Sequence, residues 1–144
     1  MNRLQGSVPP RTLKIYFDGG ARPNPGRIEV AVVARGEVHL FDDLGQGSNG
    51  DAEWLALLKA LEVAQTHGVP AFDLLGDSRA VIQQASGIVP CRTPAARAFL
   101  ACFREAAAAH PPRRLRWIPR AQNLAGIALA RRASGQSGWG PRNR

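Results

Sequence analysis

Three acidic residues, each at the edge of a predicted secondary-structure element, constrain the fold of this chain more than any other feature. Asp18 is followed by two glycines, Glu53 lies in the first turn of a predicted helix, and Asp77 precedes a serine. Clustered carboxylates repel one another unless a cation lies between them. If the acids share one metal site, the strands that end near Asp18 and Asp77 must be neighbours in one sheet.

Apolar and polar residues alternate from Leu13 to Asp18, which predicts a strand that ends at Asp18. The Gly19-Gly20 pair and the Pro-Asn-Pro-Gly segment at 23–26 predict a turn directly after this strand. With two further short apolar segments joined by short turns, the first part of the chain is typical of an antiparallel meander.

The spacing of Trp54, Leu57, Leu58 and Leu61 is typical of an amphipathic helix, which we expect to run to about His67. Three residues before it are able to cap its N-terminus: Ser48, Asn49 and Asp51.

The complete predicted order of elements is βββαβααβα. The remaining predicted elements are strands 28–34, 38–41, 72–75 and 115–118 and helices 78–85, 93–109 and 121–133. This order predicts an α/β protein whose five-stranded mixed sheet, an antiparallel three-strand meander plus parallel strands, is flanked by helices. We expect a disordered leader over residues 1–11, one folded domain over 12–133 and a flexible basic tail over 134–144.

Positive charge dominates the chain, with a net charge of +8 over 144 residues. Only Lys14 and Lys59 are lysines, and no acid follows Glu105. The arginines after Glu105 are Arg113, Arg114, Arg116, Arg120, Arg131, Arg132, Arg142 and Arg144. Charge of one sign over so long a segment indicates a polyanion as partner, although the many alanines also fit a GC-rich genome as the source of the arginine.

Length and composition predict a single cytoplasmic domain, which we expect to be a monomer. No apolar run approaches the roughly 20 residues that a membrane span needs, and the polar N-terminus lacks the apolar region of a signal peptide. Cys91 and Cys102 lack the spacing of a metal site, so we expect two reduced thiols.

Each of the three acids has a simple structural interpretation besides the functional one. Asp18 fits a turn, Glu53 fits a helix N-terminus where it interacts with the helix dipole, and Asp77 fits an N-cap. Taken together they are typical of a site for Mg²⁺, which takes oxygen ligands. Two such ions can clamp an in-line displacement at phosphorus, so the acids in an arginine-rich chain indicate phosphodiester chemistry on nucleic acid.

The same residues belong to a series of ordered motifs. These are Asp18-Gly19-Gly20 with Asn24-Pro25-Gly26, Ser48-Asn49 with Ala52-Glu53-Trp54 and Ala56-Leu57, Asp77-Ser78, and Trp117-Ile118-Pro119-Arg120 with Asn123 and Leu129-Ala130. Over residues 12–133 the chain resembles ribonuclease H type 1 and its bacterial RNase H-like relatives. The resemblance implies the RNase H-like fold and endonucleolytic cleavage of the RNA strand of an RNA–DNA hybrid by a two-metal mechanism, with Mg²⁺ or Mn²⁺ as cofactor.

The resemblance also implies roles for individual residues. Asp18, Glu53 and Asp77 would be the catalytic residues and the metal ligands, with Asp18 bridging both ions. The residues that would bind the nucleic acid are Gly19, Asn24, Asn49, Ser78, Arg79, Arg116, Arg120 and Asn123. Asn24 and Asn49 lie in segments that line the minor groove of the hybrid in the family, where 2′-hydroxyl groups distinguish RNA from DNA.

The main departure from the family pattern concerns a fourth acid. The pattern calls for an aspartate at the position of Ile127, four residues after Asn123. Isoleucine cannot coordinate a cation, and with Leu124 and Ala128 it also fits an apolar stripe that packs. Asn123 or a water would then have to fill the lost coordination role.

A second departure is the absence, between Gln84 and Thr93, of the basic, Trp-rich insertion found in some relatives. Hybrid affinity would then depend on arginines elsewhere, such as Arg113, Arg114, Arg116 and Arg120. Three functions remain open. The chain is a metal-dependent ribonuclease H that is slow or prefers Mn²⁺, a nucleic-acid-binding RNase H-like domain with little or no catalysis, or a related nuclease that acts on DNA or structured RNA.

Overall fold

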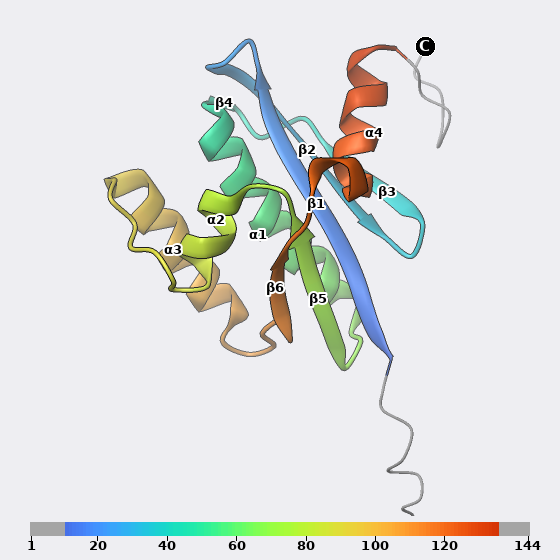
Figure 1. The fold of residues 1–144 in the computed structure, drawn as a ribbon, viewed down its shortest axis with the longest axis vertical. Helices are drawn as coiled ribbons and strands as arrows, with labels where there is room; N and C mark the ends of the chain where they lie inside the picture. Colours follow the sequence, from blue (N-terminus) through green and yellow to red (C-terminus); the bar gives the residue numbers. More distant parts are fainter. Residues whose placement is uncertain (1–10, 136–144) are drawn as a thin grey trace, which may run out of the picture.

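The computed structural model describes residues 11–135, and its elements follow the predicted order (Figure 1). The strands are β1 (Thr12–Arg22), β2 (Gly26–Ala34), β3 (Glu37–Phe41), β4 (Gln46–Gly47), β5 (Ala71–Gly76) and β6 (Arg114–Trp117). The helices are α1 (Asn49–His67), α2 (Arg79–Ala85), α3 (Pro94–Ala107), the 3₁₀ helix η2 (Arg120–Gln122) and α4 (Leu124–Ala133). The predicted leader and tail fall almost entirely outside the described residues.

A mixed sheet forms the middle layer of the molecule. Its strand order is β3-β2-β1-β5-β6, and the two-residue β4 pairs with β2 off this path. The first three strands are antiparallel, whereas β5 runs parallel to β1 and β6 runs parallel to β5. The predicted five-stranded mixed sheet is therefore confirmed, as is the adjacency of the first strand to the strand before Asp77. The short strand β4 lies where the sequence predicts a loop.

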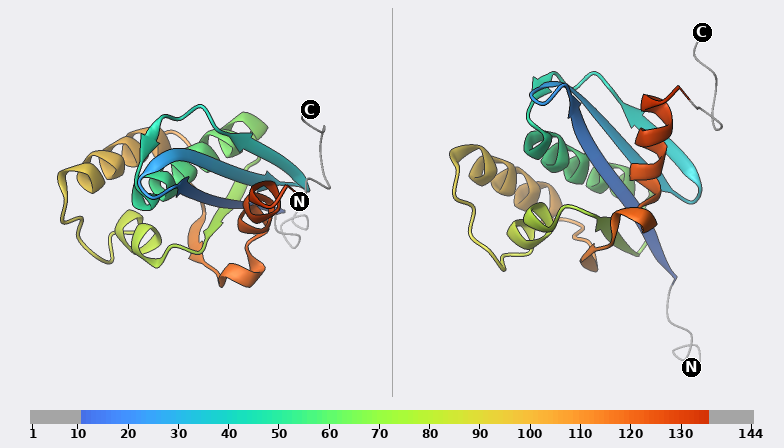
Figure 2. Two further views of the ribbon diagram at one scale, coloured as in Figure 1. Left: turned by 90° about the horizontal axis from the view of Figure 1, so that it is seen from above. Right: turned by 45° about the horizontal axis from the view of Figure 1, so that its top comes forward.

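Helices cover both faces of this sheet (Figure 2). Successive side chains of a strand point to opposite faces, and β2 follows this rule. Ile28, Val30 and Val32 belong to the core formed with α1, α2 and α3, whereas Ala31 and Val33 belong to a smaller core formed with α4. The sheet thus carries one large core beneath three helices and one small core beneath α4.

Strand β1 runs past Asp18 to Arg22, so the predicted strand end at Asp18 is wrong. Backbone pairing with β2 continues through both glycines, with Asp18 opposite Ala31 and Gly20 opposite Glu29. The turn begins only at Pro23. Asp18 is therefore held in the middle of a paired strand and not on a loop.

The glycine at position 19 serves close packing and not a turn. A Cβ atom built on Gly19 would overlap the backbone carbonyl group of Ala52 in the first turn of α1. Gly19 itself is buried. The absence of a side chain thus lets α1 approach the middle of β1 directly beside Asp18.

Capping interactions set the starts of the two helices nearest to the acids. Ser48 caps α1: its hydroxyl accepts from the backbone N–H of Asp51, and the Asp51 carboxylate accepts from the backbone N–H of Ser48. At the C-terminal end of the domain, the predicted helix 121–133 is divided. Asn123 has extended backbone angles and its side chain caps α4, so the helix begins at Leu124 and η2 precedes it.

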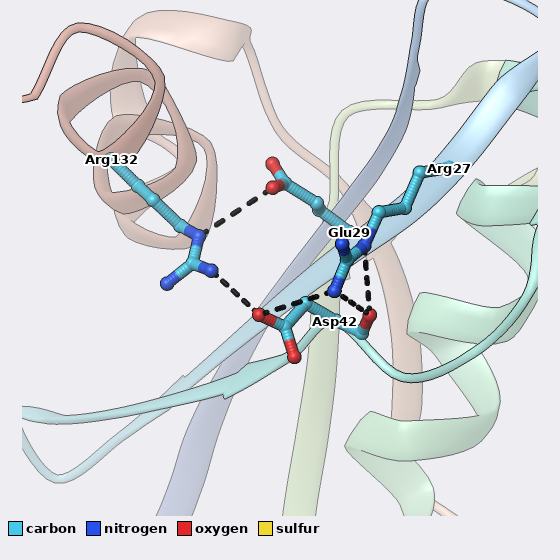
Figure 3. A network of polar contacts seen from close by, with 4 residues as sticks. All are labelled: Arg27, Glu29, Asp42 and Arg132. Atoms are coloured by element: carbon cyan, nitrogen blue, oxygen red, sulfur yellow. Dashed lines mark hydrogen bonds and ion pairs between the residues drawn. The ribbon is translucent and has the colours of Figure 1, made fainter. Parts of the chain in front are cut away.

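Several of the arginines that we expected to bind a polyanion form ion pairs with acidic residues of the protein itself. Arg132 of α4 points toward the carboxylates of Asp42 and Glu29 (Figure 3). Its guanidinium lies 2.7 Å from the Asp42 carboxylate and 3.6 Å from that of Glu29. Arg113 forms a two-point contact, at 3.1 and 2.7 Å, with the buried carboxylate of Asp73. These arginines balance acids within the protein, and Arg132 also fastens α4 to the sheet. The positive surface available to a partner is accordingly smaller than the sequence suggests.

None of the helices within residues 11–135 has the length and apolarity needed to span a bilayer.

We predict that Gly19→Ala lowers the free energy of unfolding by roughly 1–3 kcal/mol, because the added methyl group forces α1 away from β1. Gly20→Ala is the matched control, since its methyl group would meet only the Asn49 side-chain oxygen at 3.7 Å. Urea denaturation of both variants, followed by circular dichroism, measures the difference. Equal stabilities would contradict the close approach of Ala52 to Gly19.

Candidate active site

The pairing of β1 with β5 places two of the acids side by side. Tyr16 lies opposite Leu75 in the parallel register, and Asp18 and Asp77 each follow two residues later. Adjacent strands are about 4.8 Å apart, so the two carboxylates come close together at the C-terminal end of β5. Because Phe17 belongs to the core beneath α1, Asp18 points to the opposite face, on which α4 packs.

Helix α1 brings the third acid to this point. Glu53 is the fifth residue of this helix, one turn later than the sequence predicts, and it follows the residue whose backbone contacts Gly19. One carboxylate oxygen from each of Asp18, Glu53 and Asp77 lies within 4.8 Å of the other two. All three side chains are partly buried. The predicted convergence of the three acids is therefore confirmed.

Burial and mutual repulsion make ionisation of the cluster costly. Desolvation, followed by the charges of Asp77 and Glu53, raises the pKa of Asp18 to about 7. The positive charge of Arg120 and a hydrogen bond from the Gly19 backbone act against this shift without cancelling it. At neutral pH the central carboxyl group is therefore only partly ionised.

The pKa of Glu53 is raised as well, and burial is the largest cause. A hydrogen bond from the Ser78 hydroxyl lowers this pKa, the charge of Asp77 raises it, and the charge of Arg120 lowers it. Carboxylate oxygens in this number are the ligands that Mg²⁺ and Mn²⁺ prefer. Both pKa values are raised by burial and by the neighbouring acids, and a divalent ion would compensate the negative charge that these two effects disfavour, so the donor set fits such an ion.

Asn123 holds the cluster together from the α4 side. Its amide nitrogen donates to the Asp77 carboxylate and to the backbone carbonyl of Phe17, both at 3.0 Å. Its oxygen accepts from the backbone N–H of Ala125 and so caps α4. The side chain is fully buried. The predicted contact of Asn123 with nucleic acid is therefore wrong, because the side chain is fully buried and its amide nitrogen bonds within the protein. Its alternative role as a metal ligand stays a prediction.

Helix α4 presents a glycine to the acids. A Cβ atom at Gly126 would lie 3.3 Å from the Asp18 carboxylate and 3.6 Å from that of Asp77. Ile127 is 38% exposed and Leu124 is 45% exposed. The interpretation in which these two residues pack as an apolar stripe is therefore wrong, although Ala128 is buried. The position of the expected fourth acid is therefore exposed to solvent, and it follows directly after the glycine that lies beside the acids.

One further prediction about a nucleic-acid contact needs revision. Gly19 is buried against α1, so it is wrong as a contact residue. The Ser78 hydroxyl accepts from the backbone N–H of Val81, which caps α2, and it acts to lower the pKa of Glu53. Ser78 is only partly buried, so its contact with nucleic acid stays a prediction.

An aromatic residue that the sequence did not mark as functional lies beside the acids. The indole N–H of Trp117 donates to the backbone carbonyl of Asp77 at 3.1 Å, and the side chain of Arg79 lies over the Trp117 ring at 3.7 Å. Trp117 is 36% exposed and Arg79 is exposed. An apolar residue in a predicted strand is usually assigned to the core. For Trp117, the Trp-Ile-Pro-Arg motif at 117–120 was the one signal in the sequence that indicated a functional role.

The two asparagines predicted to line the minor groove connect the hairpin after β1 to the start of α1. The Asn24 side-chain oxygen accepts from the backbone N–H of Asn49 at 3.0 Å, and the Asn49 oxygen accepts from the backbone N–H of Ala21 at 2.8 Å. Both residues are exposed, as is Arg120, whereas Arg116 on β6 is half-buried. The side-chain NH₂ groups of both asparagines make no hydrogen bond within residues 11–135. They are therefore available to a binding partner.

Comparison with known proteins supports the reading of the motifs. The family described as reverse transcriptase-like matches residues 17–133. A curated ribonuclease HI from Halobacterium salinarum is 34% identical over 123 residues, which cover 82% of this chain. The aligned region spans only 62% of the length of that relative.

Solved structures show the same architecture. The crystal structure of RNase H1 from Halobacterium salinarum has a TM-score of 0.75 at 30% identity and covers 87% of this chain and 99% of its own. The crystal structure of LC11-RNase H1 in complex with an RNA/DNA hybrid has a TM-score of 0.70 at 28% identity, with 78% of this chain and 89% of its own covered.

We predict that Asp18→Asn stabilises the metal-free protein by an amount that grows as the pH rises from about 4 to about 7. Folding raises the pKa of Asp18 from 3.8 to about 7, so the folded state binds this proton more tightly in that window. The associated stability is present at low pH and is lost as the pH rises. Melting temperatures in EDTA test this, with exposed Asp43→Asn as control; a difference that shrinks with pH would contradict it.

We also predict that Asn123→Asp lowers the free energy of unfolding by about 2–4 kcal/mol at neutral pH. The variant keeps the oxygen that caps α4, but it loses the donor to Phe17 and sets a second carboxylate against Asp77. Asn24→Asp is the control, because it makes the same change at an exposed residue and keeps the acceptor for Asn49. Denaturant titration that finds equal effects would argue against the bond to Asp77.

Proposed function

The chain belongs to the ribonuclease H type 1 family, and we propose that it is a ribonuclease H that hydrolyses the RNA strand of RNA–DNA hybrids. The convergence of Asp18, Glu53 and Asp77, with oxygens within 4.8 Å, carries this proposal. The hybrid-bound structure of LC11-RNase H1 supports the substrate class. The ribonuclease HI from Halobacterium salinarum supports the reaction class.

Asp18, Glu53 and Asp77 would hold Mg²⁺ or Mn²⁺, with Asp18 in the central position. The raised pKa values of Asp18 and Glu53 support this role: burial and then the neighbouring acids disfavour their negative charge, and a cation would compensate that charge. When bound, such ions activate water and stabilise charge on the oxygens of an in-line phosphoryl displacement.

The protein's own groups keep the carboxylates in position for this chemistry. The Asn123 amide donates to Asp77, while the Gly19 backbone and the Ser78 hydroxyl favour the ionised forms of Asp18 and Glu53, respectively. Hydrogen bonds of this kind fix the orientation of a ligand. The positive charge of Arg120 lowers the cost of keeping Asp18 and Glu53 ionised when a negatively charged substrate approaches.

Exposed groups around the cluster would bind the hybrid. The Arg79 side chain, stacked on Trp117 and so held in place, would contact a backbone phosphate of the strand that is cut. The free NH₂ groups of Asn24 and Asn49 are suited to donate to 2′-hydroxyl oxygens or base edges in the minor groove. Arg116 and Arg120 would add phosphate contacts, which make the affinity fall as salt rises. That the domain acts as a monomer in the cytoplasm stays a prediction from the sequence.

A second candidate function follows from Ile127. This residue stands where the family pattern has its fourth acid and is 38% exposed, so no fourth carboxylate completes the site. With one metal position lacking a ligand, the domain would bind hybrids and cut them slowly or not at all. The two candidates differ in catalysis and not in substrate.

Cleavage of a labelled RNA–DNA hybrid in Mg²⁺ and separately in Mn²⁺ tests the proposal. We predict that the wild-type protein cuts only the RNA strand and that Asp18→Asn reduces the rate by more than about 100-fold, since even the partners of metal ligands contribute 10–100-fold. Ile127→Asp is expected to raise the rate several-fold, and Ile127→Asn, which is polar but uncharged, to raise it much less.

Binding without cleavage by the wild type, together with cleavage by Ile127→Asp, would establish the silent binding domain instead. Cleavage of a DNA duplex or of structured RNA in preference to the hybrid would contradict both candidates. Cleavage that survives Asp18→Asn unchanged would remove the assignment of the site.

A further inference from the structure

A second group of metal-binding side chains lies away from the three carboxylates. Glu37 and His39 of β3 and His67 at the end of α1 each offer one ligand atom, and these atoms lie within 4.8 Å of one another. Glu53 and His67 are separated by 14 residues of α1, which corresponds to roughly 21 Å along the helix axis. The group is therefore separate from the candidate active site.

His39 has a buried nitrogen without a partner. Its Nε2 atom is shielded from solvent and makes no hydrogen bond within residues 11–135. The nearest carboxylate oxygen, that of Glu37, is 3.8 Å away, which is beyond hydrogen-bond distance. A buried polar atom without a partner lowers the stability of the folded state. A bound ligand would supply the partner that the described protein groups do not give to this nitrogen.

The surroundings of this nitrogen leave room for a cation. His39 and His67 line an open hollow of about 260 Å³ together with Phe41, Lys59, Glu62, Val63 and Thr66. The one basic side chain in this lining is already paired: the Lys59 ammonium is 3.1 Å from the Glu62 carboxylate and 5.0 Å from the centre of the Phe41 ring. The hollow also lies at the C-terminal end of α1, where the helix dipole favours positive charge.

We propose that Glu37, His39 and His67 form a site for Zn²⁺ or a similar transition-metal ion. Two imidazole nitrogens and one carboxylate oxygen suit zinc, whose bonds of about 2.0–2.2 Å put tetrahedral ligand atoms roughly 3.3 Å apart. The 3.8 Å between the Glu37 and His39 ligand atoms shortens to this spacing if Glu37, whose side chain is 70% exposed, changes its rotamer. Water would complete the coordination of the ion.

The ion would connect two elements that are far apart in sequence. His39 lies on the edge strand β3, where it pairs with Val32 of β2, and His67 is followed by the left-handed Gly68 that ends α1. A zinc ion between them ties the end of α1 to the edge of the sheet. The expected effect is a gain in stability on metal binding, independent of the ribonuclease activity proposed above.

The test uses untagged full-length protein with Asp18→Asn as the parent, so that the carboxylate cluster contributes little to metal binding. Zinc chloride is titrated by calorimetry, and the melting temperature is measured with and without it. We expect the parent to bind one more zinc ion per chain than the same protein with His39→Gln and His67→Gln. Zinc should raise the melting temperature of the parent only, and Co²⁺ should give it the visible absorption of a nitrogen-ligated ion.

Two controls separate the site from general histidine binding. His110→Gln removes the third histidine of the chain, which stacks edge-on against Phe72, and should leave zinc binding intact. Glu37→Gln changes an exposed side chain without affecting folding and should weaken zinc binding by about tenfold or more. Zinc binding that is equal in the parent and the double-histidine variant, or unchanged by Glu37→Gln, would overturn the proposal, as would the absence of a zinc-dependent rise in the parent's melting temperature.

Discussion

The approach of α1 to β1 at Gly19 is the contact on which the remaining geometry depends. A side chain at this position would overlap the backbone of Ala52, and the helix would then have to stand off from the sheet. Glu53 follows Ala52 directly, so such a displacement would move its carboxylate away from Asp18. The register of β1 with β5 sets Asp18 beside Asp77 in the same way, through backbone pairing alone. Two backbone contacts, rather than attraction between side chains, thus force three repelling carboxylates together.

Repulsion between the three carboxylates destabilises the folded state. Helix α4, which packs on the face of the sheet opposite to α1, offsets part of this cost. Asn123 bonds to the Asp77 carboxylate and to the backbone of Phe17, and Gly126 gives the helix room beside the acids. The far end of the same helix is fastened to β2 and to the residue after β3 through Arg132 (Figure 3). Because α4 is anchored at both ends, it keeps Asn123 in position beside Asp77. The carboxylates therefore stay close together although their proximity and burial raise the pKa of Asp18 to about 7.

Local patterns in the sequence predicted most of the elements, because alternation, helical spacing and capping residues act over a few positions. The adjacency of the first strand and the strand before Asp77 was predicted in the opposite direction, because it is required if the three acids share one metal site, and the parallel pairing of β1 with β5 confirms it. The role of Gly19 was not predictable, because a Gly-Gly pair predicts a turn unless the helix that packs on it is known. Asn123 was missed for a related reason: its bond to Asp77 joins residues 46 positions apart. Ile127 looked like part of an apolar stripe, and only the position of α4 reveals that it is exposed.

Binding of Mn²⁺ measured by electron paramagnetic resonance would test most directly that the three carboxylates form a cation site. Free Mn²⁺ gives a strong signal that is lost on binding, so the titration reports the number and affinity of the ions. The wild-type protein at neutral pH is expected to remove the signal, Asp18→Asn to lose most of this capacity, and the exposed variant Asp43→Asn to keep it. If Asp18→Asn bound Mn²⁺ as tightly as the wild type, the convergence of the carboxylates would have no role in metal binding, and the proposed chemistry would lose its basis.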